Sequence, residues 1–307
     1  MGEGYGYGKV ILFGEHFVVY GLPAIASALG SKTIARIEKS DRFELIDNRI
    51  ETPGYKKEKL DQQKKSLELM FRALGIDPEK TPFRIVLEGD LIAASGIGAS
   101  AASCAAIARA LNKEFNLGLS DEKINEIAYE GEKGYHGTPS GIDNTAAVFG
   151  GLIWFKKGNP NVIERIGIKE PIEIVMGNTG ITADTAEVVA DVRRRKGEEP
   201  ERFERIFRDY EELVNEARKA FEEYDIDKIG ELMNRNHSLL QEIGVSCEEL
   251  DRLCKIAREN GALGAKLTGT GRGGNMVALT PGKELQERVA KAIESAGFKV
   301  IRSKIGV

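Results

Sequence analysis

The sequence contains few cysteines, few histidines and no long hydrophobic run. Its 307 residues include three Cys and three His, and the cysteines Cys104, Cys247 and Cys254 lack the spacing of a metal site. Each cysteine lies in a stretch expected to be helical, so we expect buried thiols rather than disulfides or a zinc centre. No stretch approaches the ~20 apolar residues that a membrane-spanning helix needs, and the first residues lack the apolar core of a signal peptide. We therefore expect a cytoplasmic protein without a membrane partner.

An excess of positive charge is also absent. Lys and Arg number 44 against 48 Asp and Glu, which gives a net charge of -4. Nucleic acid is therefore not expected as a partner, because binding it requires a basic surface. Apolar residues make up 41% of the chain, enough for a sizeable core. The length predicts two domains of about 150 residues each, and we place them at 1–160 and 161–307, because a strand and a turn precede that boundary.

Hydrophobic periodicity predicts an α+β protein in which strands and helices alternate. Strands are expected at residues 10–13, 83–87, 150–155, 172–176, 265–268, 275–280 and 299–303, with strand-like or short helical segments at 23–30 and 33–37. Helices are expected at 56–73, from the glycine loop to 111, at 121–133, 203–221, 229–243 and 284–296, and after a capping box at 246–249. Ser120 is the predicted N-cap of the helix at 121–133.

A glycine-rich loop, Ser95-Gly-Ile-Gly-Ala-Ser100, opens a helix of small residues and predicts a phosphate site. Glycine lets backbone amides approach an anion, and a helix N-terminus adds about half a positive charge. The hydroxyl of Ser100 lies where it could bind Mg²⁺ beside the phosphates. The loop has neither the Walker spacing nor the dinucleotide-binding spacing, and a simple glycine turn before a helix would also explain it.

Two carboxylates are candidates for chemistry. Glu132 lies at the edge of the apolar stripe of its predicted helix, where Mg²⁺ would satisfy its charge. Asp143 follows the turn-forming residues 137–142, which can aim it into a cleft. The alternatives are a surface glutamate and an aspartate that caps a turn or helix.

Two further segments carry polar residues at the ends of predicted strands. Lys9 precedes the strand at 10–13, whereas Glu15 and His16 follow it, so either end of that strand could face a cleft. A structural histidine is the alternative for His16. Residues 266–275 repeat the glycine-loop theme between two strands, and a β-hairpin turn explains this loop equally well.

Together and in this order, the segments resemble the GHMP kinase family, named for galacto-, homoserine, mevalonate and phosphomevalonate kinases. The three family motifs correspond to residues 7–9, 95–102 and 269–275. Residues 9–21 and 130–144 are similar to the mevalonate kinase branch, and the glycine loops resemble its trypanosomatid form. The chain departs from the family pattern at Tyr7 in place of Pro, at Ala99 in place of Ser, and at Arg272, which interrupts the third loop and could contact phosphates or solvent.

The resemblance implies a two-domain GHMP kinase fold with the active site in the cleft between the domains. It implies phosphorylation of mevalonate on its 5-hydroxyl by ATP with Mg²⁺, a step of isoprenoid precursor biosynthesis. The alternatives are a kinase of the same family that acts on phosphomevalonate or on the 3-hydroxyl of mevalonate, and a non-catalytic ligand sensor. Family analogy also allows a homodimer.

The resemblance further implies a role for each candidate residue. Asp143 would orient or deprotonate the acceptor hydroxyl, and Lys9 would stabilise developing charge. Ser100 and Glu132 would bind the metal. Mevalonate would be bound by Glu15, His16 and Thr185. ATP would be bound by the glycine loop, namely Ser95, Gly96, Ile97, Gly98, Ala99, Ser100 and Ala101.

Overall fold

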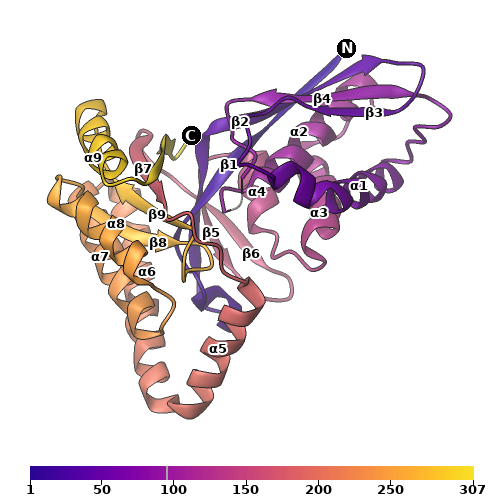
Figure 1. The fold of residues 1–307 in the computed structure, drawn as a ribbon. Coiled ribbons are helices and arrows are strands. Elements are labelled where there is room, and N and C mark those ends of the chain that lie inside the picture. Colours follow the sequence, from indigo (N-terminus) through magenta and orange to yellow (C-terminus); the bar gives the residue numbers. More distant parts are fainter. Residues whose placement is uncertain (95) are drawn as a thin grey trace. The chain divides into compact units, whose positions relative to one another are not determined.

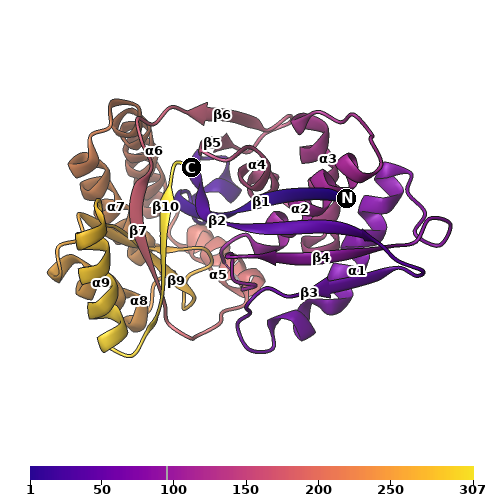
Figure 2. The same cartoon turned by 90° about the horizontal axis from the view of Figure 1, so that it is seen from above.

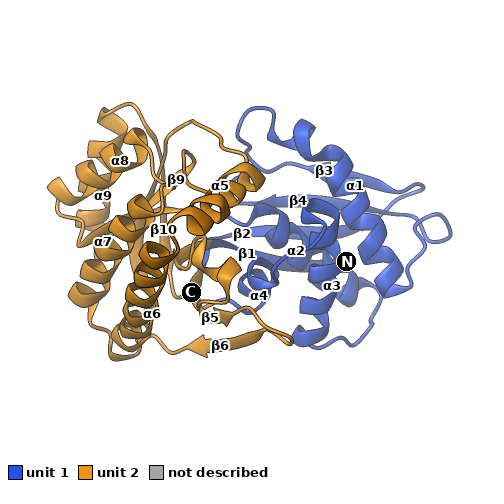
Figure 3. Ribbon diagram, turned by 90° about the horizontal axis from the view of Figure 1, so that it is seen from below, with its two compact units in different colours: residues 1–9, 28–150 blue, residues 10–27, 151–307 orange. Residues whose placement is uncertain are grey.

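A computed structural model of the chain describes residues 1–94 and 96–307 and divides into two compact units (Figure 3). Unit 1 comprises residues 1–9 and 28–150, and unit 2 comprises residues 10–27 and 151–307. Strands β1 (Gly2–Phe13) and β2 (Ala24–Lys39) each contribute residues to both units. Unit 1 ends at Gly150. The domain boundary between residues 160 and 161 stays a prediction from the sequence.

Unit 1 is a layer of strands with helices on one face (Figures 1 and 2). Strand β2 pairs with β1 and runs antiparallel to β4, which in turn runs parallel to β3. The remaining elements of this unit are β3 (Glu44–Asp47), α1 (Tyr55–Leu74), β4 (Phe83–Gly89), α2 (Ala99–Glu114), α3 (Asp121–His136) and α4 (Ile142–Phe149).

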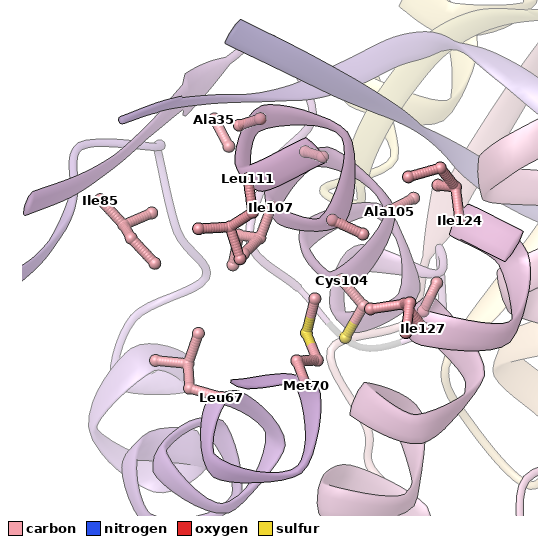
Figure 4. Packing of buried hydrophobic residues seen from close by; sticks show 14 of the residues in the cluster. Ala35, Leu67, Met70, Ile85, Cys104, Ala105, Ile107, Leu111, Ile124 and Ile127 are labelled. Carbon is pink, nitrogen blue, oxygen red and sulfur yellow. The ribbon is translucent and has the colours of Figure 1, made fainter. Parts of the chain in front are cut away.

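A hydrophobic core joins the helices and strands of unit 1. Met70 of α1, Cys104 of α2 and Ile127 of α3 are among the buried side chains that meet there (Figure 4). The thiols of Cys104 and Cys254 are buried, as predicted. The same prediction was wrong for Cys247, which is partly exposed because it lies at the N-cap of α8 and not inside a helix.

Strand β1 begins at Gly2, well before its predicted start at residue 10, because its alternating glycines pack directly against α2. A Cβ atom added to Gly2, Gly4 or Gly6 would lie 2.2 to 2.4 Å from a backbone carbonyl oxygen of that helix. Gly2, Gly4 and Gly6 face Ala110, Ala106 and Ala102 in turn, so each step of two strand residues matches a step of four helix residues. These steps have similar lengths, about 6.8 Å along the strand and about 6.0 Å along the helix, and the contact therefore repeats. The close packing fixes the first turn of α2 relative to Lys9, the last residue of unit 1 on β1.

Unit 2 contains an antiparallel sheet with the strand order β10–β7–β9–β8. Helix α7 packs on β8, α8 on β8 and β9, and α9 on β7 and β10 (Figure 1). Strand β5 pairs with the first residues of β2 and with β6. The elements are a short 3₁₀ helix (Phe17–Tyr20), β5 (Leu152–Lys156), β6 (Val162–Ile166), β7 (Ile172–Asn178), α5 (Thr185–Glu198), α6 (Pro200–Glu223), α7 (Ile226–Glu242), α8 (Glu248–Glu259), β8 (Gly264–Thr268), β9 (Asn275–Leu279), α9 (Lys283–Ser295) and β10 (Lys299–Ile305).

Of the two predicted helix N-caps, one is present in the structure and one is not. Ser120 caps α3 as predicted and accepts a hydrogen bond from the Lys123 amide. The capping box at 246–249 was wrong, because Cys247 occupies the N-cap and the hydroxyl of Ser246 instead donates to the carboxylate of Asp251 at 2.5 Å. Within the described ranges 1–94 and 96–307, no helix is long and apolar enough to cross a membrane.

Candidate active site

The first turn of α2 follows the central glycine loop in unit 1. Gly96 and Gly98 have φ values of 82° and 69°, which glycine adopts without steric cost. Gly98 is the N-cap of α2 and has no side chain with which to cap the first amides, so these amides can bind an anion. The amide of Lys9 donates to the carbonyl of Ile97 at 2.9 Å and holds the loop against β1.

Other predicted ATP-binding residues of this loop contribute backbone and not side chains. The side chains of Ile97, Ala99 and Ala101 are buried in unit 1. Only their main-chain groups are therefore candidates for contact with a nucleotide. Ser95 lies outside the described residues.

The two predicted catalytic residues form an ion pair. The Lys9 ammonium lies 2.8 Å from Oδ1 of Asp143, and their side chains are 9% and 30% exposed. Asp143 lies in the first turn of α4, which follows Gly141 with a φ of 92°. The turn predicted at residues 137–142 ends at Gly141, because α4 begins at Ile142. An ion pair largely shielded from solvent orients both groups.

Glu132 is a buried carboxylate close to this ion pair. Its residue is 1% exposed, and Oε1 has no hydrogen-bond partner among the described residues. The pKa of Glu132 is raised to about 8: burial and the charge of Asp143 raise it, and together they outweigh a hydrogen bond with Ser100 and the charge of Lys9, which lower it. Its other oxygen lies 3.7 Å from Nε2 of His136, one turn later on α3.

These features fit a divalent cation. A buried carboxylate oxygen without a partner, a neighbouring carboxylate and a serine hydroxyl are the hard oxygen ligands that Mg²⁺ prefers. In the part of the chain that the structure describes, no group of three or more His, Cys, Asp or Glu side chains could hold a metal. A cation bound by Ser100 and Glu132 would therefore take further ligands from phosphates and water.

Glu15 and His16 follow β1 in unit 2, and both are buried. One carboxylate oxygen of Glu15 pairs with the ammonium of Lys266, a fully buried residue of β8, and the other has no partner among the described residues. Nε2 of His16 lies 2.6 Å from the carbonyl oxygen of Thr270. Burial lowers the pKa of His16, although the hydrogen bond to Thr270 and the charge of Glu15 oppose that effect. Nδ1 of His16 has no partner in the described chain.

Thr185 lies beside the same loop of unit 2. It is the first residue of α5, which is capped by Asp184, and its hydroxyl lies 2.7 Å from the hydroxyl of Thr270. The third glycine loop thus contacts both His16 and Thr185. Lys266 and Thr270 were not among the residues predicted from the sequence, although a lysine within an otherwise apolar strand indicates a buried ion pair or a site.

Arg272 in the third glycine loop is held by contacts within unit 2. Its guanidinium pairs with Asp191 of α5 and donates to the carbonyl of Gly244 at 3.1 and 3.2 Å. Its amide donates to the carbonyl of Val245 at 2.8 Å. Arg272 therefore connects the loop to α5 and to the segment between α7 and α8.

Comparisons with known proteins agree with this arrangement. The family model for the GHMP kinases N terminal domain matches residues 63–151, and the GHMP kinases C terminal model matches residues 217–299. A mevalonate kinase from Pyrococcus abyssi is 39% identical over 94% of this chain and 91% of its own length. A mevalonate kinase from Saccharolobus solfataricus is 31% identical over 88% of this chain and 87% of its own.

A solved structure is similar over nearly its whole length. The crystal structure of L. major mevalonate kinase in complex with R-mevalonate has a TM-score of 0.95 and 40% identity, and the match covers 99% of this chain and 96% of that chain. A Methanococcus jannaschii mevalonate kinase structure has a TM-score of 0.83 and 25% identity, with 99% and 98% covered.

Proposed function

The chain belongs to the GHMP kinase family, and we propose that it transfers a phosphoryl group from ATP to the 5-hydroxyl of mevalonate. The proposal is supported by the similarity to the L. major enzyme with bound R-mevalonate, which extends over 99% of this chain. The observation that carries the chemistry is the ion pair between Lys9 and Asp143, which lies near a buried, unpartnered oxygen of Glu132.

In the proposed mechanism, Asp143 orients the acceptor hydroxyl and accepts its proton, and the ammonium of Lys9 holds that carboxylate in place. The amides of the first turn of α2 bind the phosphates. Ser100 and Glu132 would hold Mg²⁺, which would supply positive charge that neutralises the phosphates. Phosphoryl transfer needs mainly positioning and charge stabilisation, and these are what the four side chains supply.

The proposed acceptor-binding residues belong to unit 2. Glu15 and His16 each have a buried acceptor atom without a partner in the described chain, because Nε2 of neutral His16 donates to the Thr270 carbonyl and leaves Nδ1 unprotonated. A buried acceptor of this kind favours a ligand hydroxyl, which can donate a hydrogen bond to it. The hydroxyl of Thr185 adds a third polar group. A cytoplasmic location, the lack of nucleic-acid and membrane partners, and a homodimer stay predictions of the sequence.

A substrate panel tests the proposal. The purified protein with Mg²⁺ and ATP should phosphorylate mevalonate in preference to phosphomevalonate, homoserine and galactose. Phosphorus NMR distinguishes the products, because a phosphate on the 5-oxygen couples to a methylene group and one on the tertiary 3-oxygen does not. Asp143→Asn is the control for background hydrolysis. Preferred turnover of another acceptor, or a product without the methylene coupling, would contradict the proposal.

A further inference from the structure

We infer that Arg49 is a positioning residue that fixes the first turn of α2, and with it Ser100, for the phosphates of the nucleotide. The inference rests on the proposed function, because it assumes that phosphates bind at this turn. Arg49 is 6% exposed and lies just after β3, outside all three glycine loops. It would act through α2 and not through contact with the substrate.

One side of the Arg49 guanidinium is held by an aspartate. Nε lies 2.9 Å from Oδ1 of Asp47, and Nη2 lies 2.6 Å from Oδ2. Burial would raise the pKa of Asp47, but the hydrogen bonds and charge of Arg49 outweigh burial and leave it lowered. The two-pronged contact fixes the plane of the guanidinium, which a lysine ammonium cannot do.

The other side of the guanidinium contacts α2. Nη1 donates to the hydroxyl of Ser103 at 2.8 Å and to the carbonyl of Ala99 at 3.4 Å. The Ser103 hydroxyl itself donates to the Ala99 carbonyl at 2.8 Å, so Arg49 and Ser103 meet at the residue that precedes Ser100. Nη1 also donates to the hydroxyl of Thr33 on β2 at 3.1 Å, which connects the helix start to the sheet.

The segment that carries Arg49 is itself anchored. The ammonium of Lys56 on α1 donates to the carbonyls of Asp47 and Arg49 at 2.7 and 2.5 Å, and the amide of Asn48 donates to the carbonyl of Leu87 on β4 at 2.8 Å. A small pocket in unit 1 is lined by residues that include Arg49, Lys59 and Ser100. Arg49 and Ser100 therefore border the same small pocket, and the contacts of Arg49 hold the turn from the side of β2 and β3, in addition to the packing of β1 against α2.

Loss of this anchor should impair use of the nucleotide more than use of the acceptor. Arg49→Lys keeps the charge and loses the two-pronged geometry, so the first turn of α2 should shift. A displacement of about 1 Å can cost about 10²-fold in rate, so we expect kcat/KM for ATP to fall at least tenfold. The KM for mevalonate should stay within about threefold of the wild-type value, because the hydrogen-bond partners of Arg49 lie in unit 1, whereas the proposed acceptor residues belong to unit 2.

The test compares Arg49→Lys with Arg84→Lys. Arg84 pairs with Glu44 at 2.7 Å across β3 and β4 of the same unit, so its replacement also removes an arginine–carboxylate pair from this sheet. Arg84→Lys should keep wild-type kinetics. The double variant Arg49→Met/Asp47→Asn removes both charges together, so that neither is left buried and unpaired. The double variant should fold, and it should bind ATP more weakly than the wild type does.

Calorimetry of Mg²⁺ and ATP binding separates this inference from the proposed function, because it needs no acceptor. Weaker ATP binding by both Arg49 variants supports the inference, even if the wild type fails to phosphorylate mevalonate and the proposed function falls. Folded Arg49 variants that bind ATP as the wild type does would overturn the inference. A fall in thermal stability and active fraction with an unchanged KM for ATP would also overturn it.

Discussion

His237 of α7 should make the protein sensitive to acid. Its side chain is 4% exposed, with Nε2 at 3.1 Å from Oδ1 of Asp251, while Nδ1 accepts a hydrogen bond from the amide of Leu267 at 3.3 Å. Because Nδ1 accepts, the single ring proton of the neutral form lies on Nε2 and faces the aspartate. Protonation of Nδ1 would place its N–H against the N–H of Leu267, so that two donors face each other. We therefore expect the ring to be neutral in the folded protein.

The size of the effect follows from the pKa of His237. Burial lowers this pKa to about 4, and the charges of Lys266 and Arg258 act in the same direction, whereas Asp251 opposes them. A histidine in the unfolded chain titrates near 6.5, so between these two values the unfolded state binds more protons. Stability should fall as the pH falls through this window. The loss from this one group is about 2 kcal/mol at pH 5 and about 3 kcal/mol at pH 4.

Urea unfolding of the wild type and of His237→Asn measures this loss. The side-chain oxygen of Asn can replace Nδ1 as the acceptor for Leu267, and it does not titrate. His16 and His136 are present in both proteins, so the difference in unfolding free energy isolates His237. Between about pH 7.5 and about pH 5, the wild type should lose about 2 kcal/mol relative to the variant. A constant difference, or a wild type that gains stability in acid through an ion pair with Asp251, would refute the reasoning.

Four further predictions concern the proposed chemistry. Ser100→Ala and Glu132→Gln should each lower kcat, since each removes an oxygen ligand; wild-type kinetics for both across a Mg²⁺ titration would exclude the metal assignment. Asp143→Asn should lower kcat by about 10²–10⁴-fold while calorimetry shows both substrates still bound, and turnover within a few fold of wild type would remove Asp143 from the mechanism. His16→Ala should raise the KM for mevalonate more than that for ATP, whereas a heat-labile protein with unchanged KM values would indicate a structural role. Arg272→Ala should lower thermal stability and leave the KM for ATP nearly unchanged, because the guanidinium binds Asp191 and the Gly244 carbonyl; a tenfold rise, equivalent to ~1.4 kcal/mol, would indicate phosphate contact.

Local signals in the sequence predicted much of the fold. The buried stripe of α6, which includes Phe203, Ile206, Tyr210 and Leu213, recurs at three-and-four spacing and gave a helix. The positive φ values of Gly96 and Gly98 are a local property that the glycine-loop motif encodes. Such features depend on a few neighbouring residues and can be recognised without knowledge of tertiary contacts.

Elements with weak local signals were missed. Helix α5 buries only Val188 and Val192 among its described residues, so its sequence lacks a strong apolar stripe. The glycines at the start of β1 disfavour a strand in isolation, and only the close approach of α2 makes them suitable there. The contacts of Arg49 with Ala99 and Ser103 join residues about fifty positions apart, which no local pattern indicates.

Residues 11–16, which include the proposed acceptor-binding residues Glu15 and His16, are positioned by residues far away in the sequence. In unit 2, Lys266 pairs with Glu15, the hydroxyl of Thr268 donates to the Ile11 carbonyl at 2.9 Å, and the Thr270 carbonyl lies against His16. Lys266 and Thr268 lie two residues apart, so their side chains share one face of β8 (Gly264–Thr268), and the loop that follows the strand brings the Thr270 carbonyl to His16. The strand therefore fixes both ends of the 11–16 segment and holds His16 at a φ of 62°, a conformation that a non-glycine residue keeps only when its surroundings impose it. The sequence motif identified His16 as a candidate, but its orientation depends on contacts more than 250 residues away, at Thr270.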